Sequence, residues 1–214
     1  MTQLQKLETE LNRLFDLFNQ KYYSGSLCKP IIVVQSNGKD RRTMGWCTCE
    51  KVWKDHTKQA YYYEISICSE YLYRDVKEIC STLLHEMVHL YCQENDIKDT
   101  SRGNTYHNKR FKSVAESHGL VISYDKRIGW SITELSPSSI AFVEINADSS
   151  AFILTRKRHV IPHEAGNENI GKEEKSKQSF RKYVCPGCGC IIRATKEVNI
   201  ICGDCNLAFV KKEF

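Results

Sequence analysis

Hydrophobic positions near the start of the chain recur at three- and four-residue steps. The recurring residues are Leu4, Leu7, Leu11, Leu14, Phe15 and Phe18, and most positions between them are polar or charged. This period places the apolar side chains on one face of a helix. We therefore predict an amphipathic helix that packs on the core and ends at the Ser24-Gly25-Ser26 segment.

Short aliphatic and aromatic runs follow this helix. Residues 30–34 and 61–67 are rich in β-branched and aromatic side chains, which favour strands, and residues 44–47 suggest a further short strand. The Asn37-Gly38 pair predicts a turn, and residues 51–60 predict a turn or loop.

The next helix is predicted to be apolar on every side. It is expected to begin after Ser69 or Asp75 and to end near residue 95. Its centre holds a His-Glu-x-x-His segment at residues 85–89, among the apolar neighbours Ile79, Leu83, Leu84, Met87, Val88, Leu90 and Tyr91. A helix of this kind is normally buried, and burying two imidazoles and a carboxylate costs free energy unless something compensates for it.

Residues 85–89 have the spacing of a zinc site. His85 and His89 are four residues apart, so their side chains lie one helical turn apart on the same face and can reach one ion. Glu86 projects from the next row, where it can hold a water molecule bound to that ion. We therefore prefer a catalytic zinc site to a chance match whose histidines are satisfied by hydrogen bonds in the core.

A catalytic zinc site usually has a third protein ligand and one open position. The remaining candidates are His56, His107, His118, His159, His163, Glu94 and Glu116. A third helix is predicted at residues 107–117 and ends at Gly119, an αL cap. His107 and His118 would lie about 16 Å apart on it, so one site cannot readily use both. His118 suits the helix carboxyl end. Spacing alone leaves the choice open, and we favour His107 because it adjoins a loop able to turn back onto the metal helix.

The alternation of hydrophobic and polar residues is less regular after this third helix. Residues 120–124 and the region around Trp130 predict closing strands or extended segments, and residues 136–139 suggest a domain edge. Residues 140–145 and 151–154 predict a small hairpin. The charged residues 156–159 and 166–177 predict a solvated linker.

Two Cys-x-x-Cys pairs near residue 200 predict a zinc ribbon. We assign its ligands as Cys185, Cys188, Cys202 and Cys205, with Cys190 as a spare. Four thiolates close the coordination sphere, so this zinc would be structural. Residues 191–194 and 207–210 predict short strands. The basic residues of the ribbon suit phosphate contact, and a solvated face explains them equally well: Arg181, Lys182, Arg193, Lys196, Lys211 and Lys212.

The composition of the chain restricts its possible partners and compartment only a little. The net charge of +5 permits nucleic-acid contact without demanding it. Eleven cysteines beside an N-terminus without an apolar signal segment predict a reducing compartment rather than a disulfide framework. No apolar run approaches membrane-spanning length, so we expect no membrane partner. Trp46, Trp53, Trp130 and the tyrosines at 61–63 suggest packing more than stacking on unpaired bases.

Several landmarks together resemble one known family. The His-Glu-x-x-His helix is followed by a polar loop and then by Tyr106-His107-Asn108-Lys109-Arg110-Phe111. Residues 18–27, Gly45-Trp46-Cys47 and Ile65-Ser66-Ile67 precede it. This order is similar to that of the SprT-like zinc metalloproteases, which include the Spartan proteases, over roughly residues 4–135. The resemblance implies zinc ligands at His85, His89 and His107, a catalytic Glu86, and DNA-crosslinked protein as the substrate.

Together these features predict an α+β chain in three parts. Residues 1–137 form a zincin-like metalloprotease domain with a small sheet packed on helices, residues 138–180 a connector, and residues 181–214 a small β zinc ribbon. We expect two Zn²⁺ ions, one catalytic and one structural. The substrate would be a polypeptide lying extended beside an edge strand, for which we choose residues 61–67. Glu86 would take a proton from water and pass it to the leaving amine.

Two other functions fit the same residues. One is a zinc-containing nucleic-acid-binding or regulatory protein with little or no peptidase activity, which the intact Glu86 disfavours. The other is a metal-dependent hydrolase of a non-protein amide. For the preferred function we expect DNA as a partner, single-stranded DNA in particular. We also expect a monomer in the cytoplasm, nucleoid-associated in a prokaryote and nuclear in a eukaryote.

Overall fold

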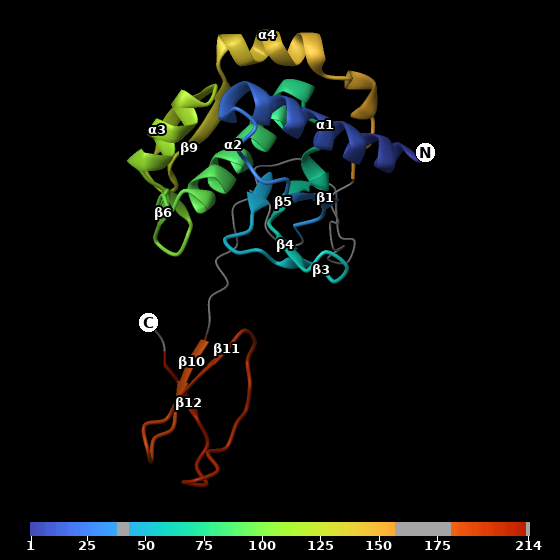
Figure 1. The fold of residues 1–214 in the computed structure, drawn as a ribbon. Coiled ribbons are helices and arrows are strands. Elements are labelled where there is room, and N and C mark those ends of the chain that lie inside the picture. The colour runs from blue at the N-terminus through green and yellow to red at the C-terminus, as the bar shows by residue number, and fades with distance from the viewer. Residues whose placement is uncertain (38–42, 157–180, 213–214) are drawn as a thin grey trace, which may run out of the picture. The chain divides into compact units, whose positions relative to one another are not determined.

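The computed structural model describes residues 1–37, 43–156 and 181–212, which fall in two compact units, Met1–Val160 and Ile161–Phe214 (Figure 1). The first unit is mixed α+β and the second is a small sheet. The helices are α1 (Gln3–Tyr23), η1 (Ser69–Tyr71), α2 (Val76–Glu94), α3 (Lys109–Ser117), α4 (Pro137–Asn146) and η2 (Ser149–Ala151). The strands of the first unit are β1 (Ile31–Gln35), β2 (Gly45–Cys47), β3 (Trp53–Asp55), β4 (Ala60–Tyr62), β5 (Glu64–Cys68), β6 (Thr100–Ser101), β7 (Tyr106–His107), β8 (Leu120–Asp125) and β9 (Gly129–Leu135).

The amphipathic helix predicted at the start of the chain is confirmed as α1. Thr2 and Gln5 form a capping box at its first turn, and Ser24 ends it in a left-handed conformation. Five of the six residues on the predicted apolar face are fully buried, namely Leu7, Leu11, Leu14, Phe15 and Phe18, whereas Leu4 in the first turn is 42% exposed. The helical period in the sequence therefore identifies the buried face correctly.

The first sheet has the strand order β1-β5-β2, with β5 parallel to β1 and antiparallel to β2. The single strand predicted at residues 61–67 is in fact two strands, β4 and β5. The prediction that it is an edge strand is also wrong, because β5 lies between its two neighbours. The outer strands of this sheet are β1 and β2.

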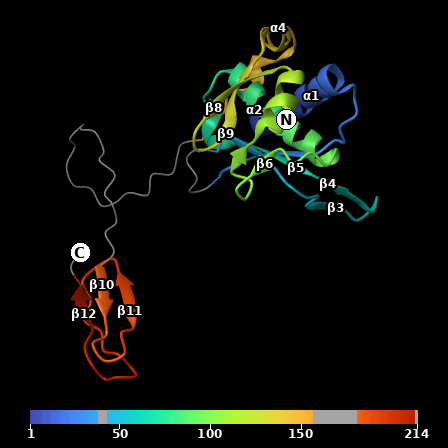
Figure 2. The ribbon, with the colours of Figure 1, turned by 90° about the vertical axis from the view of Figure 1, so that its left-hand side faces the viewer.

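The predicted loop at residues 51–60 contains the strand β3, which pairs with β4 in an antiparallel hairpin (Figure 2). Every residue of β3 is at least partly exposed. A two-stranded ribbon whose two faces are both exposed to solvent does not need alternating apolar and polar residues. Its sequence therefore resembles that of a loop.

Helix α2 is the centre of the first unit. Asp75 rather than Ser69 caps it, and Glu78 completes a capping box. The helix contacts α1, α3 and α4 as well as β2, β5, β8 and β9. Its apolar residues are buried on every side, as predicted, except that Val76 and Tyr91 are half-buried.

The second sheet has the order β6-β7-β9-β8. The closing strands predicted at residues 120–124 and around Trp130 are β8 and β9, which pair as an antiparallel hairpin, and β7 meets β9 at a single pair, His107 with Gly129. The third helix begins at Lys109 and not at His107 as predicted. Asn108 is its N-cap, since its side chain accepts hydrogen bonds from the Arg110 and Phe111 amides.

The small hairpin predicted at residues 140–154 is wrong. Residues 137–146 form α4, for which Ser136 is the N-cap and Pro137 the first residue. The helix packs on α1, with the Phe18 and Phe142 ring centroids 6.0 Å apart, and Figures 1 and 2 both show it above α1. Tertiary packing here outweighs the strand preference of the Ile140–Ile145 residues. The first unit therefore continues past the predicted domain edge.

The second unit contains β10 (Arg181–Val184), β11 (Ile191–Ala194) and β12 (Val210–Lys212), with β10 paired to both others. The strand predicted at residues 191–194 is confirmed. The one predicted at 207–210 is displaced, because β12 begins at Val210 and Ala208 makes only an isolated bridge to Ile201. In the described ranges, the structure has no helix with the length and apolar character to cross a membrane. The predicted linker at 166–177 lies outside the described residues.

Gly119 lies where the end of α3 meets α1 and α4, and it generates a prediction about stability. Its φ is +86°, and an added Cβ would lie 2.5 Å from Tyr22 Cζ and 2.6 Å from Ser139 Oγ. We expect Gly119→Ala to lower the free energy of unfolding by about 1–2 kcal/mol for the left-handed backbone and by about 1–3 kcal/mol more for overpacking. Denaturant unfolding followed by the helical circular dichroism signal measures this loss.

Gly103→Ala is the matched control. Its φ is +63°, yet nothing lies within 4 Å of the added Cβ. It should therefore show only the backbone part of the loss. Equal losses in the two variants would contradict a tightly packed junction at Gly119.

Candidate metal centres

Three imidazoles converge on one point in the first unit. The Nε2 atoms of His85 and His89 are 3.2 Å apart, and that of His107 lies 3.2 Å from the first and 3.1 Å from the second. His85 and His89 lie one turn apart on α2, while His107 comes from β7. The structure thus brings together the two motif histidines and the favoured third candidate.

The Nδ1 atoms of the three rings determine what the Nε2 atoms can do. Asp99 accepts from His89 Nδ1, and the Ile128 carbonyl accepts from His107 Nδ1 at 3.4 Å. Thr133 Oγ1 donates to the Ser131 carbonyl, so it accepts from His85 Nδ1 at 2.7 Å. Each neutral ring therefore carries its proton on Nδ1 and a lone pair on Nε2. Three lone pairs directed at one point repel one another unless a cation lies between them.

This donor set fits zinc. Zn–N bonds of about 2.0–2.1 Å in a tetrahedron place ligand nitrogens about 3.3 Å apart, close to the separations seen here. Burial lowers the pKa of His107 to about 4 and lowers that of His85 well below its ordinary value. Burial is the largest single effect on the pKa of His89 and acts to lower it, but the hydrogen bond to Asp99 and the charges of Glu86 and Asp99 together outweigh it, so the net pKa is raised. The His85 and His107 rings are therefore neutral near pH 7, as metal ligands must be.

The position of His107 depends on close backbone contacts. Its amide donates to the Ile128 carbonyl at 2.9 Å. Gly129 has a φ of +77°, and a Cβ there would lie 2.1 Å from the His107 carbonyl oxygen. Only glycine allows this approach of β7 to β9. Asn108 holds the other side, since its amide donates to the Asp99 carbonyl and its side chain to the Lys98 carbonyl.

Phe111 supports all three imidazoles from α3. Its ring centroid lies 4.7 Å from that of His85, 4.8 Å from that of His89 and 4.6 Å from that of His107. The side chain is fully buried. Sequence reasoning assigned Phe111, Asp99 and Thr133 no part in the site. No spacing rule connects residues 99 and 133 to the motif.

Glu86 lies beside the three histidines in the wall of the same cleft. It is only 5% exposed, and the Cys47 backbone amide hydrogen-bonds its carboxylate. Burial raises its pKa to about 7, against the opposing effect of His89. A carboxyl group with a pKa near neutrality can both take and return a proton.

The cleft that contains these groups has a volume of about 1360 Å³ and is bounded by two strands. Strand β2, an outer strand of the first sheet, lines it. Residues 131–135 of β9 line it too, and among the described residues they pair only with β8, because β7 reaches β9 at Gly129 alone. Two strand edges therefore line the cleft that contains the metal ligands.

The other predicted candidates for the third ligand lie elsewhere. His118 caps α3, where Nδ1 contacts the Val114 carbonyl at 2.6 Å and the ring stacks on Tyr23. Its predicted role at the helix end is confirmed. His56 lies in the turn between β3 and β4, Glu94 accepts from the Cys28 amide, and Glu116 pairs with Lys112. His159 and His163 are outside the described residues.

A second group of ligands occurs in the ribbon. The Sγ atoms of Cys185, Cys188, Cys202 and Cys205 lie within 4.8 Å of one another. Among the described residues Cys190 is outside this group, and its carbonyl instead accepts from the Cys185 amide at 2.9 Å. Four clustered thiols are consistent with a closed structural zinc site.

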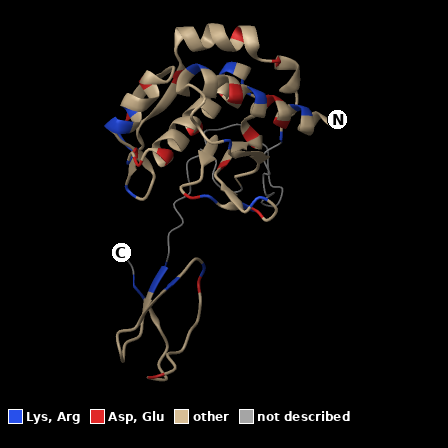
Figure 3. Ribbon diagram, viewed as in Figure 1, with Lys and Arg blue, Asp and Glu red and all other residues tan. Residues whose placement is uncertain are grey.

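One acidic residue partly neutralises the positive charge of the ribbon residues that we predicted to contact phosphate. Figure 3 shows Lys and Arg gathered on its strands. Glu197 pairs with Lys211 at 2.7 Å and lies 3.8 Å from Arg181. Lys182 and Lys212 face each other across the ladder between β10 and β12. This face is basic, but less so than the sequence suggests.

Residues 11–128 match the model of the SprT-like family. This match spans more than half of the 214 residues, so the chain belongs to the SprT-like family. It includes α2, β7 and therefore all three histidines, and it ends before the four-cysteine ribbon. Searches of curated proteins and of solved structures gave no match.

The contact between Thr133 and His85 generates a prediction about metal affinity. We expect Thr133→Val to weaken metal binding at the three histidines by about 10- to 100-fold, because His85 loses the acceptor that orients it. Co²⁺ titration measures this, since thiolate charge-transfer absorption reports the ribbon separately. Thr133→Ser keeps the hydroxyl and should bind normally, and an equal loss in both variants would show that the hydroxyl is not the cause.

The ribbon generates a prediction about metal content. We expect Cys202→Ser to reduce bound zinc from two equivalents to one, because three thiolates hold the ion less well than four. Cys190→Ser is the control and should keep both equivalents. Elemental analysis of the purified full chain measures the content, and zinc loss in the Cys190 variant would place that residue in the ligand set.

Proposed function

We propose that the chain is a zinc-dependent metalloendopeptidase with a zincin-like first unit. The observation that carries this proposal is the convergence of three Nε2 lone pairs beside a buried carboxylate, in a cleft lined by two strand edges. Membership of the SprT-like family suggests the same type of activity. His85, His89 and His107 would hold the catalytic ion, and the four ribbon cysteines would hold a structural one.

Glu86 is the proposed general base. When bound, zinc would lower the pKa of water and polarise the scissile carbonyl. The Glu86 carboxylate would take a proton as the water oxygen bonds to the carbonyl carbon. As the C–N bond breaks, Glu86 would pass that proton to the nitrogen of the leaving amine. The Cys47 amide, which donates to this carboxylate, would help to orient it.

The substrate class follows from the walls of the cleft. Strands β2 and β9 both present backbone edges to it, and an extended polypeptide can add to such an edge as a further strand. This arrangement replaces the edge at residues 61–67 that we expected from the sequence. A small non-protein amide would leave most of a cleft of about 1360 Å³ unfilled, so the geometry favours a peptide.

We further propose that the substrates are DNA-bound or DNA-crosslinked proteins. The resemblance to the Spartan proteases and the basic ribbon strands support this proposal. The rival function, a nucleic-acid-binding or regulatory protein without peptidase activity, shares the ribbon but gives Glu86 no task. A measurement of peptidase activity therefore distinguishes the two functions.

The decisive variant is Glu86→Gln. We expect it to keep two zinc equivalents and the wild-type circular dichroism spectrum, and to lose about 10²- to 10⁴-fold in peptide-bond cleavage, because the amide cannot accept the proton. Cleavage of casein, of histones and of the chain itself is measured with and without single-stranded DNA.

Glu8→Gln is the matched control. Glu8 lies on α1, which among the described residues contributes nothing to the cleft, so activity should be unchanged. Equal activity of Glu86→Gln and wild type would remove Glu86 from its role. If no form of DNA changes wild-type cleavage, the DNA-linked substrate is excluded while the peptidase remains.

A further inference from the structure

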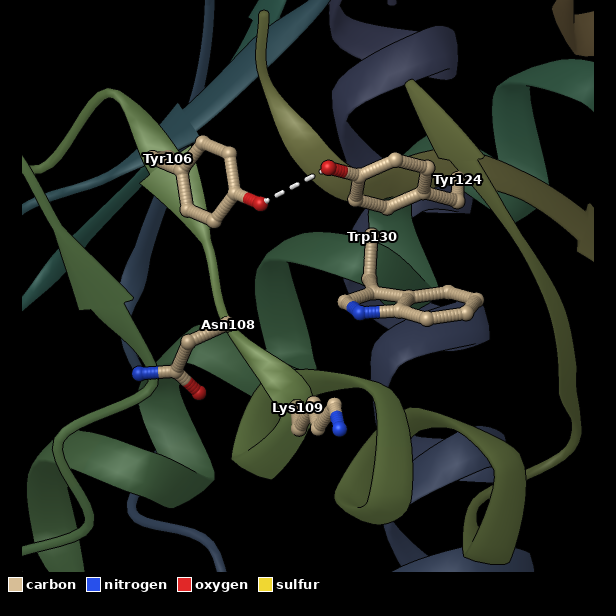
Figure 4. Close-up of a pocket in the computed structure, with 5 residues that line it drawn as sticks. All are labelled: Tyr106, Asn108, Lys109, Tyr124 and Trp130. Carbon is tan, nitrogen blue, oxygen red and sulfur yellow. Dashed lines mark hydrogen bonds between the residues drawn. The ribbon is translucent and has the colours of Figure 1, made fainter. Parts of the chain in front are cut away.

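A second cavity lies beside the third histidine and has a different chemistry. It is lined by three aromatic side chains, one amide and one cation, and has a volume of about 420 Å³: Tyr106, Asn108, Lys109, Tyr124 and Trp130 (Figure 4). This volume is within the range of small-ligand sites in proteins. Among the described residues, its lining shares no member with the lining of the metal cleft.

The cavity adjoins the metal cleft along the second sheet. Tyr106 precedes His107 on β7, and Trp130 precedes the cleft residue Ser131 on β9. The two linings nevertheless have no described residue in common, so a ligand in the cavity does not occupy the catalytic cleft.

Three aromatic rings form the walls. Tyr124 and Trp130 are in contact, with centroids 5.1 Å apart and planes tilted by 55°. Tyr106 stands opposite, and its hydroxyl lies 3.3 Å from that of Tyr124 (Figure 4). Tyr124 is 49% exposed although it is aromatic. An open cavity between aromatic faces suits a flat ring.

Cations surround these rings. Lys112 Nζ lies 4.2 Å from the Trp130 ring centroid, the Arg102 guanidinium lies 4.3 Å from that of Tyr106, and Lys109 lines the cavity itself. Two carboxylates are close by. Glu116 pairs with Lys112 at 3.6 Å, and Asp125 accepts from the Arg127 and Ile128 turn amides. The rim therefore keeps a positive excess, to which α3 contributes Lys and Arg at one end (Figure 3).

We propose that this cavity is a stacking site for an unpaired base of single-stranded nucleic acid, with the neighbouring phosphates on Lys109, Lys112 and Arg102. A flat ring joined to an anion satisfies both the aromatic walls and the basic rim. An apolar side chain of a peptide would use only the aromatic walls and would bring no anion to the positively charged rim. A base inside a duplex is stacked on its neighbours and cannot enter.

The site accepts a base without identifying it. The Asn108 side chain is held by the protein, since it donates to the Lys98 carbonyl and accepts from two amides of α3. The two tyrosine hydroxyls bond to each other. Stacking alone tolerates every base. This inference rests on the cavity and holds whether or not the metal site cleaves peptides.

Tyr124→Ala in the full, zinc-loaded chain tests the site. We expect the dissociation constant for a fluorescent dT oligonucleotide to rise by about 5- to 100-fold, because one stacking wall is lost. Tyr124→Phe keeps the ring and should bind like wild type. Tyr61→Ala is the matched control, because Tyr61 is 53% exposed and has Lys54 over its ring but lines no part of this cavity. Lys109→Gln should reduce the slope of log K against log salt by about 0.7.

Photocrosslinking locates the contact independently of the ribbon. A 5-iodouracil oligonucleotide, as DNA or as RNA, should crosslink to Tyr106, Tyr124 or Trp130, and duplex should not. Crosslinks confined to residues 181–212, or equal binding by Tyr124→Ala and Tyr61→Ala, would overturn the proposal. Protection of Tyr124 by a phenylalanine-rich peptide but not by the oligonucleotide would also overturn it and would assign the cavity to polypeptide.

Discussion

Three lone pairs directed at one point are the constraint on which the first unit is built. Neutral imidazoles with protons on Nδ1 repel one another when their Nε2 atoms lie 3.1–3.2 Å apart, so the surrounding structure has to hold them there until a cation binds. Each Nδ1 has its own acceptor, from Asp99, Thr133 or the Ile128 carbonyl. Those acceptors come from three separate segments, and α2, α3 and the second sheet are all needed to assemble them.

The parts of this arrangement that the sequence could predict are local ones. The period of α1, the spacing of His85 and His89 and the two Cys-x-x-Cys pairs each depend on residues within a few positions of one another. The sequence did not allow us to predict features that depend on residues far apart in the chain. His107 is on a strand because Asn108 caps the helix one residue later, and Gly129 matters only because β9 passes so close to β7. The edge role of β2 depends on strand order, and α4 depends on its packing against α1, which no single segment encodes.

The two ligand groups relate to their surroundings in opposite ways. The histidines are held by hydrogen bonds to Thr133 and Asp99, so protein contacts as well as a metal orient their rings. The cysteines lie in the turns beside a short sheet, and among the described residues of that unit the buried apolar side chains are only Tyr183, Cys185 and Cys202. So little buried surface cannot hold that sheet together, and its metal would have to contribute folding free energy. The histidines would serve a reaction site, whereas the cysteines would stabilise the fold of the second unit.

The two strand edges in the cleft have a consequence for selectivity. A wall of backbone amides and carbonyls binds a chain whose own amides and carbonyls are free, and a chain in a helix or an inner strand has none to offer. A target would therefore be chosen less by its side chains than by how often a segment of it comes loose. A native neighbour would be spared, and a damaged or partly unfolded one would be exposed to attack, with local stability in the target acting as the filter.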